Sequence, residues 1–409
     1  MSTPWLTLIG IGEDGRDGLS AQANRLIDQA PFIIGGERHL ALIGKTDSET
    51  KAWPQPFEQG IEMVLARRGQ STLVLASGDP FFYGVGATLA KRLATEEIRT
   101  LAAPSAFSLT AAKLGWAIQD CALLSLHGRP FERIAQHLQP HAKLIALTWD
   151  GTTASKLASH LVDKGMGQSL INVCEALGGK RERMVKKTAQ AIHETQEIFD
   201  PLNTLGIEIV TSRGAKIIPL TSGLEDDLFE HDNQITKREI RAITLSSLAP
   251  LQGQLLWDIG AGSGSISIEW MLRHPSNRAI AIEPRADRAA RITRNALSLG
   301  VPELKLIEGS APAALGGLST PDAIFIGGGG TDPAVINAAW EMLQEGGSLV
   351  ANAVTIETQA DLMRRHVEMG GTLSKIEVSR ADPVGPFHGW RASMPVLQWV
   401  IVKGAEKRA

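Results

Sequence analysis

Short apolar and β-branched runs alternate with amphipathic helical patterns along the whole chain. In the first half, runs such as Trp5–Ile9, Leu73–Ala76 and Leu144–Leu147 predict strands, while Ser20–Gln29 and Thr153–Lys164 predict helices. Alternation of this kind is typical of α/β proteins whose strands run parallel. The pattern therefore predicts an α/β fold with mainly parallel sheets.

The second half repeats the alternation at a different scale. Its predicted strands are Leu255–Ile259, Ala279–Ile282, Leu304–Ile307, Ala323–Ile326, Ser348–Ala353, Leu373–Val378 and Pro395–Val402. Helical patterns lie between most of these strands, and the last two strands follow one another directly. This arrangement predicts a doubly wound sheet of seven strands with an antiparallel strand at its edge.

A polar, acidic stretch from Thr221 to Asn233 separates the two halves. We interpret it as the boundary between two domains, which predicts a first domain over residues 1–222, a linker over 223–233 and a second domain over 234–409. An acidic surface loop within one domain is the alternative interpretation.

Composition narrows the class of protein. Of the 409 residues, 43% are hydrophobic and 21% are charged, as in soluble globular proteins, and the net charge of −3 favours neither nucleic acid nor an anionic membrane. Cys121 and Cys174 lie far apart and have no metal-ligand spacing, so we expect no bound metal and a reducing compartment. With no signal-peptide pattern and no membrane-spanning run, we expect a cytoplasmic enzyme.

The sharpest motif is a glycine loop that joins a predicted strand to a predicted helix. It contains Gly260, Gly262 and Gly264 in alternation, and such glycines let backbone amides approach a ligand closely. Glu283 ends the next predicted strand, where its carboxylate can accept hydrogen bonds from both hydroxyls of a ribose. A glycine-rich turn without a ligand is the alternative.

The spacing of this loop distinguishes between two nucleoside cofactors. A dinucleotide fingerprint that starts at Gly260 requires Gly or Ala at position 265, which is Ser265. The observed spacing suits S-adenosylmethionine, because this cofactor has no pyrophosphate. Asp258 precedes the loop and suits the amino group of a methionine moiety. Ser310 and Ala311 follow the third strand, where small residues flank an adenine ring.

The first half carries a different set of turns. Gly10–Gly15 satisfies the dinucleotide pattern, but the following helix begins near Ser20, so no helix N-terminus is available for a pyrophosphate. A second turn, Ser77–Gly86, contains Asp79-Pro80, in which proline keeps the acid out of the helical region. Residues Pro104–Ser108 form a third turn, which is also expected at the carboxyl edge of the sheet. By pattern alone, Asp79-Pro80 is equally consistent with an ordinary turn.

These turns give the first half a resemblance to the tetrapyrrole methylase family, which has a glycine-rich first loop, a Gly-Asp-Pro turn and a Pro-Ser segment. Ser125–Arg129, Thr148–Gly151 and Cys174–Gly179 are similar to segments of its ring-carbon C5 branch. The first loop differs from the Gly-Pro-Gly-Asp form of many relatives, because it reads Gly12-Glu13-Asp14-Gly15. The resemblance implies a domain of two α/β subdomains.

The second half resembles the decarboxylating C15 methyltransferases of corrin synthesis. The similar segments are Thr236–Arg241, the glycine loop, Gly309–Pro312, Gly327–Gly330 and Pro386–Arg391. This resemblance implies a Rossmann-like, seven-stranded class I methyltransferase domain that uses S-adenosylmethionine.

Together the two resemblances imply a bifunctional methyltransferase of cobalamin (vitamin B12) biosynthesis with two S-adenosylmethionine sites per chain. Its expected reactions are methylation of precorrin-6B at C5 by the first domain and at C15 by the second. The second domain also removes CO2 from the ring-C (C12) acetate, which gives precorrin-8. The resemblance further implies a homo-oligomer, either a dimer or a tetramer.

Three alternatives remain at this point. One is the same chemistry on the cobalt-containing intermediates of the anaerobic route. The others are a nucleic-acid methyltransferase and a non-catalytic nucleotide-sensing module, although the chain lacks the cluster of basic and aromatic residues typical of the former.

The resemblance and the motifs also imply roles for individual residues. Lys237, Arg241 and Arg391 are expected to pair with substrate carboxylates, as are Arg129 and Arg380, and His388 is expected to handle protons. Trp390 is expected to stack on the macrocycle or to lie in the core. The expected cofactor-binding residues of the second domain are Thr236, Asp258, Gly260, Ala261, Gly262, Ser263, Gly264, Glu283, Ser310 and Ala311. Those of the first domain are Gly10, Gly12, Asp79, Pro80, Phe81, Ser105 and Ala106.

Overall fold

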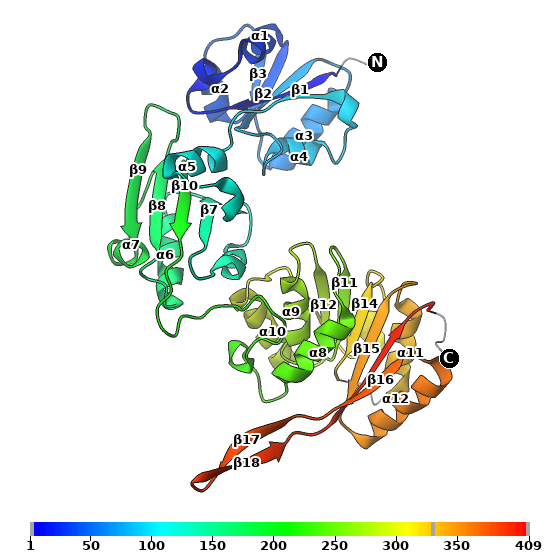
Figure 1. Cartoon of the computed structure of the whole chain (residues 1–409). Helices are drawn as coiled ribbons and strands as arrows, with labels where there is room; N and C mark the ends of the chain where they lie inside the picture. The colour runs from blue at the N-terminus through cyan, green and yellow to red at the C-terminus, as the bar shows by residue number, and fades with distance from the viewer. Residues whose placement is uncertain (1–3, 329–331, 406–409) are drawn as a thin grey trace. The chain divides into compact units, whose positions relative to one another are not determined.

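The computed structural model describes residues 4–328 and 332–405 and divides the chain into two compact units (Figure 1). The first unit holds the chain up to residue 129 together with residues 137–217. The second holds residues 130–136 and the chain from residue 218 onward. In the part of the chain that the structure describes, no helix is long and apolar enough to cross a membrane.

The first sheet of the first unit is entirely parallel, in the order β3-β2-β4-β1-β5. Its strands are β1 Leu6–Ile11, β2 Phe32–Gly35, β3 Glu49–Ala52, β4 Thr72–Ser77 and β5 Ile98–Leu101. Its helices and 3-10 turns are η1 Gly15–Gly18, α1 Ala21–Gln29, α2 Glu37–Ile43, α3 Phe57–Ala66, α4 Val85–Leu89 and η2 Thr95–Glu97. Alternate strand residues pack on α1 and α2 on one face and on α3 and α4 on the other, because a strand points successive side chains to opposite faces.

The second sheet has the order β6-β7-β10-β8-β9, and only the pair β6–β7 is parallel. Its strands are β6 Cys121–Ser125, β7 Lys143–Leu147, β8 Leu170–Glu175, β9 Arg183–Thr188 and β10 Asn203–Glu208. The helices and 3-10 turns of this region are α5 Ala106–Leu114, η3 Ile118–Asp120, α6 Thr153–Asp163 and α7 Ala189–Thr195, whereas η4 Phe131–His137 falls in the second unit except for its last residue. The prediction of mainly parallel sheets is therefore wrong for this sheet. Strand β9 was not predicted, because its alternation is weak and four of its six residues are Arg, Lys or Thr.

The main sheet of the second unit has the order β13-β12-β11-β14-β15-β19-β16, with β19 antiparallel to both of its neighbours. Its strands are β11 Leu255–Ile259, β12 Arg278–Glu283, β13 Lys305–Glu308, β14 Ala323–Ile326, β15 Ser348–Ala353, β16 Thr372–Ile376 and β19 Val396–Val402. The helices and 3-10 turns are η5 Asp226–Leu228, α8 Arg238–Leu248, α9 Ser265–Leu272, α10 Ala286–Ser298, η6 Ala313–Leu315, α11 Pro333–Met342 and α12 Ile356–Met369.

Alternate residues of β11 show how this sheet buries both of its faces. Trp257 packs with residues of α11 and α12, whereas Leu256 packs with residues of α8, α9 and α10. The α/β architecture predicted from the alternation is confirmed.

Two features of the second unit differ from the prediction. Strands β17 Ser379–Val384 and β18 Phe387–Ala392 form a hairpin that projects from the sheet (Figure 1). The segment expected to be a linker also contacts this unit, because the amides of Gly223 and Leu224 donate to the buried carboxylate of Glu269 at 2.7 and 3.0 Å.

Candidate active sites

The glycine loop of the second unit follows β11 and ends at α9, as the sequence predicts. Gly260, Gly262 and Gly264 all have positive φ angles, of 72°, 61° and 75°, which side chains rarely tolerate. A Cβ at Gly260 would lie 2.6 Å from the backbone of Gly328, and one at Gly264 would lie 2.9 Å from Ile292. The loop is therefore a close backbone approach rather than a flexible turn.

Glu283 lies at the end of β12 and is 2% exposed. One carboxylate oxygen accepts the amide of Gly262 at 2.8 Å, and the other accepts the amide of Arg285 at 3.1 Å. A carboxylate has about four acceptor positions, so two remain for hydroxyl donors. The two amide bonds hold Glu283 beside the glycine loop with acceptor capacity to spare.

Asp258 is buried between β11 and α9 and lines neither of the pockets described below. Its Oδ2 accepts the amide and the hydroxyl of Ser267 at 3.1 and 2.5 Å. Its Oδ1 has no hydrogen-bond partner among the described residues. Burial raises the pKa of this carboxyl to about 6, against the opposing effect of the Ser267 bonds. A free oxygen on a buried carboxylate fits a cationic amino group that arrives directly or through water.

Two pockets meet at the glycine loop and share Gly260, Arg288 and Gly328. The smaller, of about 180 Å³, is lined by residues that include Glu283, Ser310 and Ala311. The larger, of about 430 Å³, is lined by Gly260, Ala261 and Gly262 together with residues 233–237. Thr236 and Lys237 therefore lie beside the predicted loop. Ser263 and Gly264 line neither pocket; the Ser263 hydroxyl is buried without a partner among the described residues. Of the predicted Gly327–Gly330 run, Gly329 and Gly330 lie outside the described residues.

Three cations line the larger pocket, Lys237, Arg288 and Arg380, and each is paired with a carboxylate; Arg288 pairs with Asp232 at 3.0 Å. The Lys237 ammonium lies 3.8 Å from Asp226, and the Arg380 guanidinium is paired with Glu239 at 2.5 Å. Lys237 and Arg380 are about half exposed, at 42% and 47%. Anionic groups of a ligand can therefore replace these partners without leaving a charge buried.

Sequence analysis missed Asn352, which also lines this pocket. Its amide donates to Thr244 at 2.9 Å and accepts from Gln398 at 2.9 Å. Gln398 is itself held by Ser247 at 2.8 Å. Asn352 lies on β15 and its partners lie on α8 and β19, so no local sequence pattern could predict this network.

Arg241 does not reach the pocket, which corrects its predicted role in binding substrate. Its side chain is fully buried, and its Nε donates to Glu269 at 2.5 Å. Its Nη1 donates to the carbonyl of Thr236, and its Nη2 donates to the carbonyl of Leu224 and to the Asp226 carboxylate. Because its charge is already matched in the interior, Arg241 holds α8 and the segment before it in place.

His388, Trp390 and Arg391 lie on the projecting hairpin and line neither pocket. Arg391 pairs with Asp382 on the adjacent strand at 3.0 Å. Trp390 is 79% exposed, so the core alternative for it is wrong. The stacking and proton-handling roles need a ligand or a partner that reaches this hairpin.

In the first unit, three predicted turns come together at the carboxyl ends of parallel strands. A Cβ at Gly10 would lie 1.7 Å from the carbonyl oxygen of Gly78, and one at Gly78 would lie 2.8 Å from that of Pro104. Helix α1 begins at Ala21 with Ser20 as its N-cap, well beyond the glycines. The three turns are therefore in direct backbone contact, and α1 does not begin within the first glycine loop.

Two pockets adjoin these turns. One, of about 90 Å³, is lined by Gly12, Ser77, Gly78 and Ala106 among others, and the other, of about 490 Å³, by residues that include Ser105, Ala106 and Arg129. Four predicted residues line neither pocket: Gly10, Asp79, Pro80 and Phe81. The Asp79 carboxylate accepts the amide of Phe81 at 2.8 Å, which stabilises the turn.

The wall between these pockets carries polar residues that the sequence did not reveal. Arg38 donates to the Ser77 hydroxyl at 2.8 Å and is paired with Glu13. The His39 ring nitrogen lies 2.8 Å from the same hydroxyl. Burial, helped by the neighbouring Arg38, lowers the pKa of His39 to about 4, so its ring is neutral at pH 7. The members of this cluster come from different turns, and only the fold joins them.

Comparison with known proteins accounts for both halves. A family model described as Tetrapyrrole (Corrin/Porphyrin) Methylases matches residues 5–193, and one described as Precorrin methyltransferase domain matches residues 227–403. A Sinorhizobium sp relative named precorrin-6Y C(5,15)-methyltransferase [decarboxylating] is 54% identical over 98% of this chain and 97% of its own. A relative of the same name from Mycobacterium tuberculosis is 36% identical over 97% of this chain and 100% of its own.

The chain belongs to the precorrin-6Y C5,15-methyltransferase (decarboxylating) family. Methyltransferases of this family use S-adenosylmethionine, so the chain is an enzyme of that class. A crystal structure of the C-terminal domain of precorrin-6Y C5,15-methyltransferase from Rhodobacter capsulatus is 46% identical. It covers 46% of this chain and 100% of that one, with a TM-score of 0.44.

Proposed function

We propose that this enzyme of cobalamin biosynthesis methylates C5 and C15 of precorrin-6B and removes CO2 from the C12 acetate, giving precorrin-8. The identity of 54% over nearly the whole chain to a relative named for both positions carries this proposal. Because both full-length relatives are named for a precorrin, we propose the cobalt-free substrate rather than the cobalt-containing one.

The two reactions belong to two domains in this proposal. Residues 1–222 form a tetrapyrrole methylase domain for C5, and residues 234–409 form a Rossmann-like class I methyltransferase domain for C15 and the decarboxylation. Each domain holds one S-adenosylmethionine site, and we expect a homo-oligomer in the cytoplasm.

S-adenosylmethionine fits the residues of the second unit. When bound, it supplies an electrophilic methyl group carried by a sulfonium. Glu283 has two acceptor positions left for ribose hydroxyls, and Asp258 has an unpartnered buried oxygen for the amino group. Ser310 and Ala311 leave room in the smaller pocket for an adenine.

The larger pocket suits a tetrapyrrole that carries many carboxylates. Lys237 and Arg380 can pair with acetate or propionate groups, and Asn352 can donate a neutral hydrogen bond. Apolar residues, among them Ile240 and Phe325, exclude water from the rest of the wall. Alignment and desolvation are the main requirements of an in-line methyl transfer, and loss of CO2 needs its carboxylate held perpendicular to the conjugated ring.

The test is incubation of the enzyme with precorrin-6B and methyl-labelled cofactor. Mass spectrometry should detect two added methyl groups and the loss of one CO2. In Glu283→Gln the amide must face one of the two backbone N–H donors, so C15 methylation and CO2 release should be lost while C5 methylation persists. If Glu283→Gln keeps both methylations, the assignment of the second site is wrong. A parallel incubation with the cobalt complex tests the choice of substrate.

A further inference from the structure

Residues 230–237, which we call the strap, precede α8 and pass over the glycine loop. A Cβ on Gly262 would lie 3.3 Å from the carbonyl oxygen of Gln234, so the strap and the loop are in backbone contact. Asn233 turns the strap with a positive φ of 69°. Because residues 233–237 of the strap line the larger pocket together with Gly260 and Gly262, the strap forms a wall beside the glycine loop that we assign to the cofactor.

One end of the strap is held by neutral hydrogen bonds. The Asn295 side chain, 2% exposed on α10, accepts the amide of Glu230 at 2.8 Å. It donates to the carbonyls of Glu230 and Ser263 at 3.0 and 2.9 Å. Asn295 thereby ties the strap, the glycine loop and α10 together at this end.

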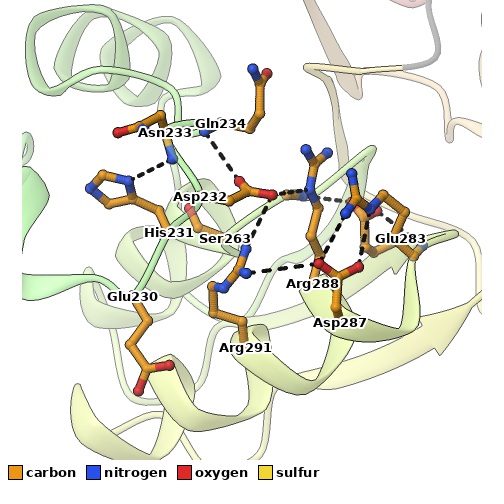
Figure 2. A network of polar contacts seen from close by, with 12 residues as sticks. Glu230, His231, Asp232, Asn233, Gln234, Ser263, Glu283, Asp287, Arg288 and Arg291 are labelled. Atoms are coloured by element: carbon orange, nitrogen blue, oxygen red, sulfur yellow. Dashed lines mark hydrogen bonds and ion pairs between the residues drawn. The ribbon is translucent and has the colours of Figure 1, made fainter.

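The middle of the strap is held by charge. Figure 2 shows the Asp232 carboxylate between the guanidinium groups of Arg288 and Arg291, at 3.0 and 3.4 Å. The other Asp232 oxygen accepts the amide of Gln234 at 3.2 Å. Although burial opposes ionisation, the bonds from Arg288 and from the Gln234 amide lower the pKa of Asp232 to about 2, so it is charged at physiological pH.

Arg288 connects this ion cluster to the ligand, because it lines both pockets at the point where they meet. A cofactor with its adenosine near Glu283 and its methionine under the strap passes this residue. The Glu230 side chain differs: it points away from the cluster in Figure 2 and pairs with Arg294 where both are more than half exposed.

We propose that Asp232 is a positioning residue that latches the strap over the cofactor and balances the charge of Arg288 and Arg291. This rests on the proposed assignment of the second site to S-adenosylmethionine. Without the carboxylate, the Arg288 guanidinium at the junction of the pockets has no ion-pair partner among the described residues, and Arg291 beside it keeps only Asp287, so the positive charge near the sulfonium cation is less compensated. The neutral product, S-adenosylhomocysteine, does not experience that repulsion. Asp232 therefore holds the strap over the cofactor and also favours binding of S-adenosylmethionine over S-adenosylhomocysteine.

Asp232→Asn tests the latch sharply, since an amide oxygen can still accept from Gln234 while the charge is lost. We expect the KM for S-adenosylmethionine, measured by CO2 release, to rise on the order of tenfold. We expect kcat and C5 methylation to stay within about twofold. Inhibition of CO2 release by S-adenosylhomocysteine should weaken by a smaller factor.

Glu230→Gln is the matched control, because it removes another carboxylate of the strap that is also paired with an arginine of α10, Arg294. We expect its KM to stay within about twofold of the wild type. Equal KM values for Asp232→Asn and Glu230→Gln overturn the latch. If Asp232→Asn weakens S-adenosylmethionine and S-adenosylhomocysteine by the same factor, the proposed charge balance is wrong.

Hydrogen exchange on the unmodified enzyme keeps the proposal testable if Asp232→Asn does not fold. The amides of residues 230–237 should gain protection when S-adenosylhomocysteine is added, and unchanged exchange there overturns the strap. If instead the wild type releases no CO2 from precorrin-6B while the strap gains protection, the proposed function fails and the strap stands.

Discussion

Replacement of Arg241 by methionine separates a structural role from a catalytic one. The substitution keeps the volume of an unbranched side chain but removes the charge that faces Glu269, a carboxylate with no exposed surface. Glu269 keeps the amides of Gly223 and Leu224 as partners, yet its charge is no longer paired. We therefore expect the second unit to lose stability.

The size of the loss follows from the burial of both partners. Removal of one member of a buried ion pair costs about 3–5 kcal/mol, because the remaining charge stays in the interior. In a unit of this size each kcal/mol corresponds to roughly 2–4 °C, so its unfolding transition should fall by roughly 6–20 °C. The carbonyl of Thr236 also loses a donor, so the KM for the cofactor should rise.

Scanning calorimetry of the full chain measures the transition, and CO2 release measures activity. Arg238→Met is the control, because Arg238 lies on the same helix and pairs with Glu225 where both are about half exposed. Its unfolding free energy should change by at most about 1 kcal/mol. An Arg241→Met variant that melts like the wild type but releases no CO2 would refute the reasoning and restore the predicted contact with substrate.

Three further changes test the rest of the site. In Gly10→Ala the new Cβ meets the Gly78 carbonyl, so mass spectrometry should detect C15 methylation and CO2 loss without C5 methylation. Lys237→Met should raise the KM for the tetrapyrrole by about 10-fold or more in initial-rate assays, because a charged hydrogen bond contributes about 1.5–3 kcal/mol. Burial raises the pKa of Asp258 from 3.8 to about 6, so the folded state holds this proton more tightly than the unfolded state does. The resulting stabilisation of the fold is fully present below about pH 4 and is lost as the pH rises to about 6. An amino group prefers the ionised form, so the KM for S-adenosylmethionine in CO2 release should rise as pH falls below about 6, and Asp258→Asn should remove that dependence.

Local patterns explain what could be predicted about the glycine loops. The strand, the three glycines and the helix that follow one another around Gly262 specify a backbone approach within a short segment. Glu283 was predictable because it ends the next strand, and parallel neighbours bring their carboxyl ends to one edge. The first loop, Gly10–Gly15, satisfies the dinucleotide pattern by itself; the late start of α1 at Ala21 argued against that interpretation, but only the family resemblance replaced it.

Burial and distant pairing explain what could not be predicted. Arg241 and Lys237 are both cations at the start of α8, and the sequence gives no reason to separate them. In the structure Arg241 points into the interior, whereas Lys237 lines the pocket. His388, Trp390 and Arg391 of β18 were expected at the site, but the hairpin projects from the sheet and these three residues line neither pocket. No spacing rule brings Arg38 to Ser77, because Arg38 follows β2 and Ser77 ends β4, and these strands are neighbours only in the folded sheet.

The sequence by itself therefore determined the α/β architecture, the glycine loops and the family, since each depends on short-range backbone preferences or on similarity along the whole chain. The tertiary structure alone decided which charges serve as internal supports and which face a ligand. Asp232 illustrates the reason: its sequence context is an acidic stretch, but the fold sets it between two arginines of α10, 56 and 59 residues further along the chain. The free energy of a charge depends on what surrounds it, and only the packed chain supplies those surroundings.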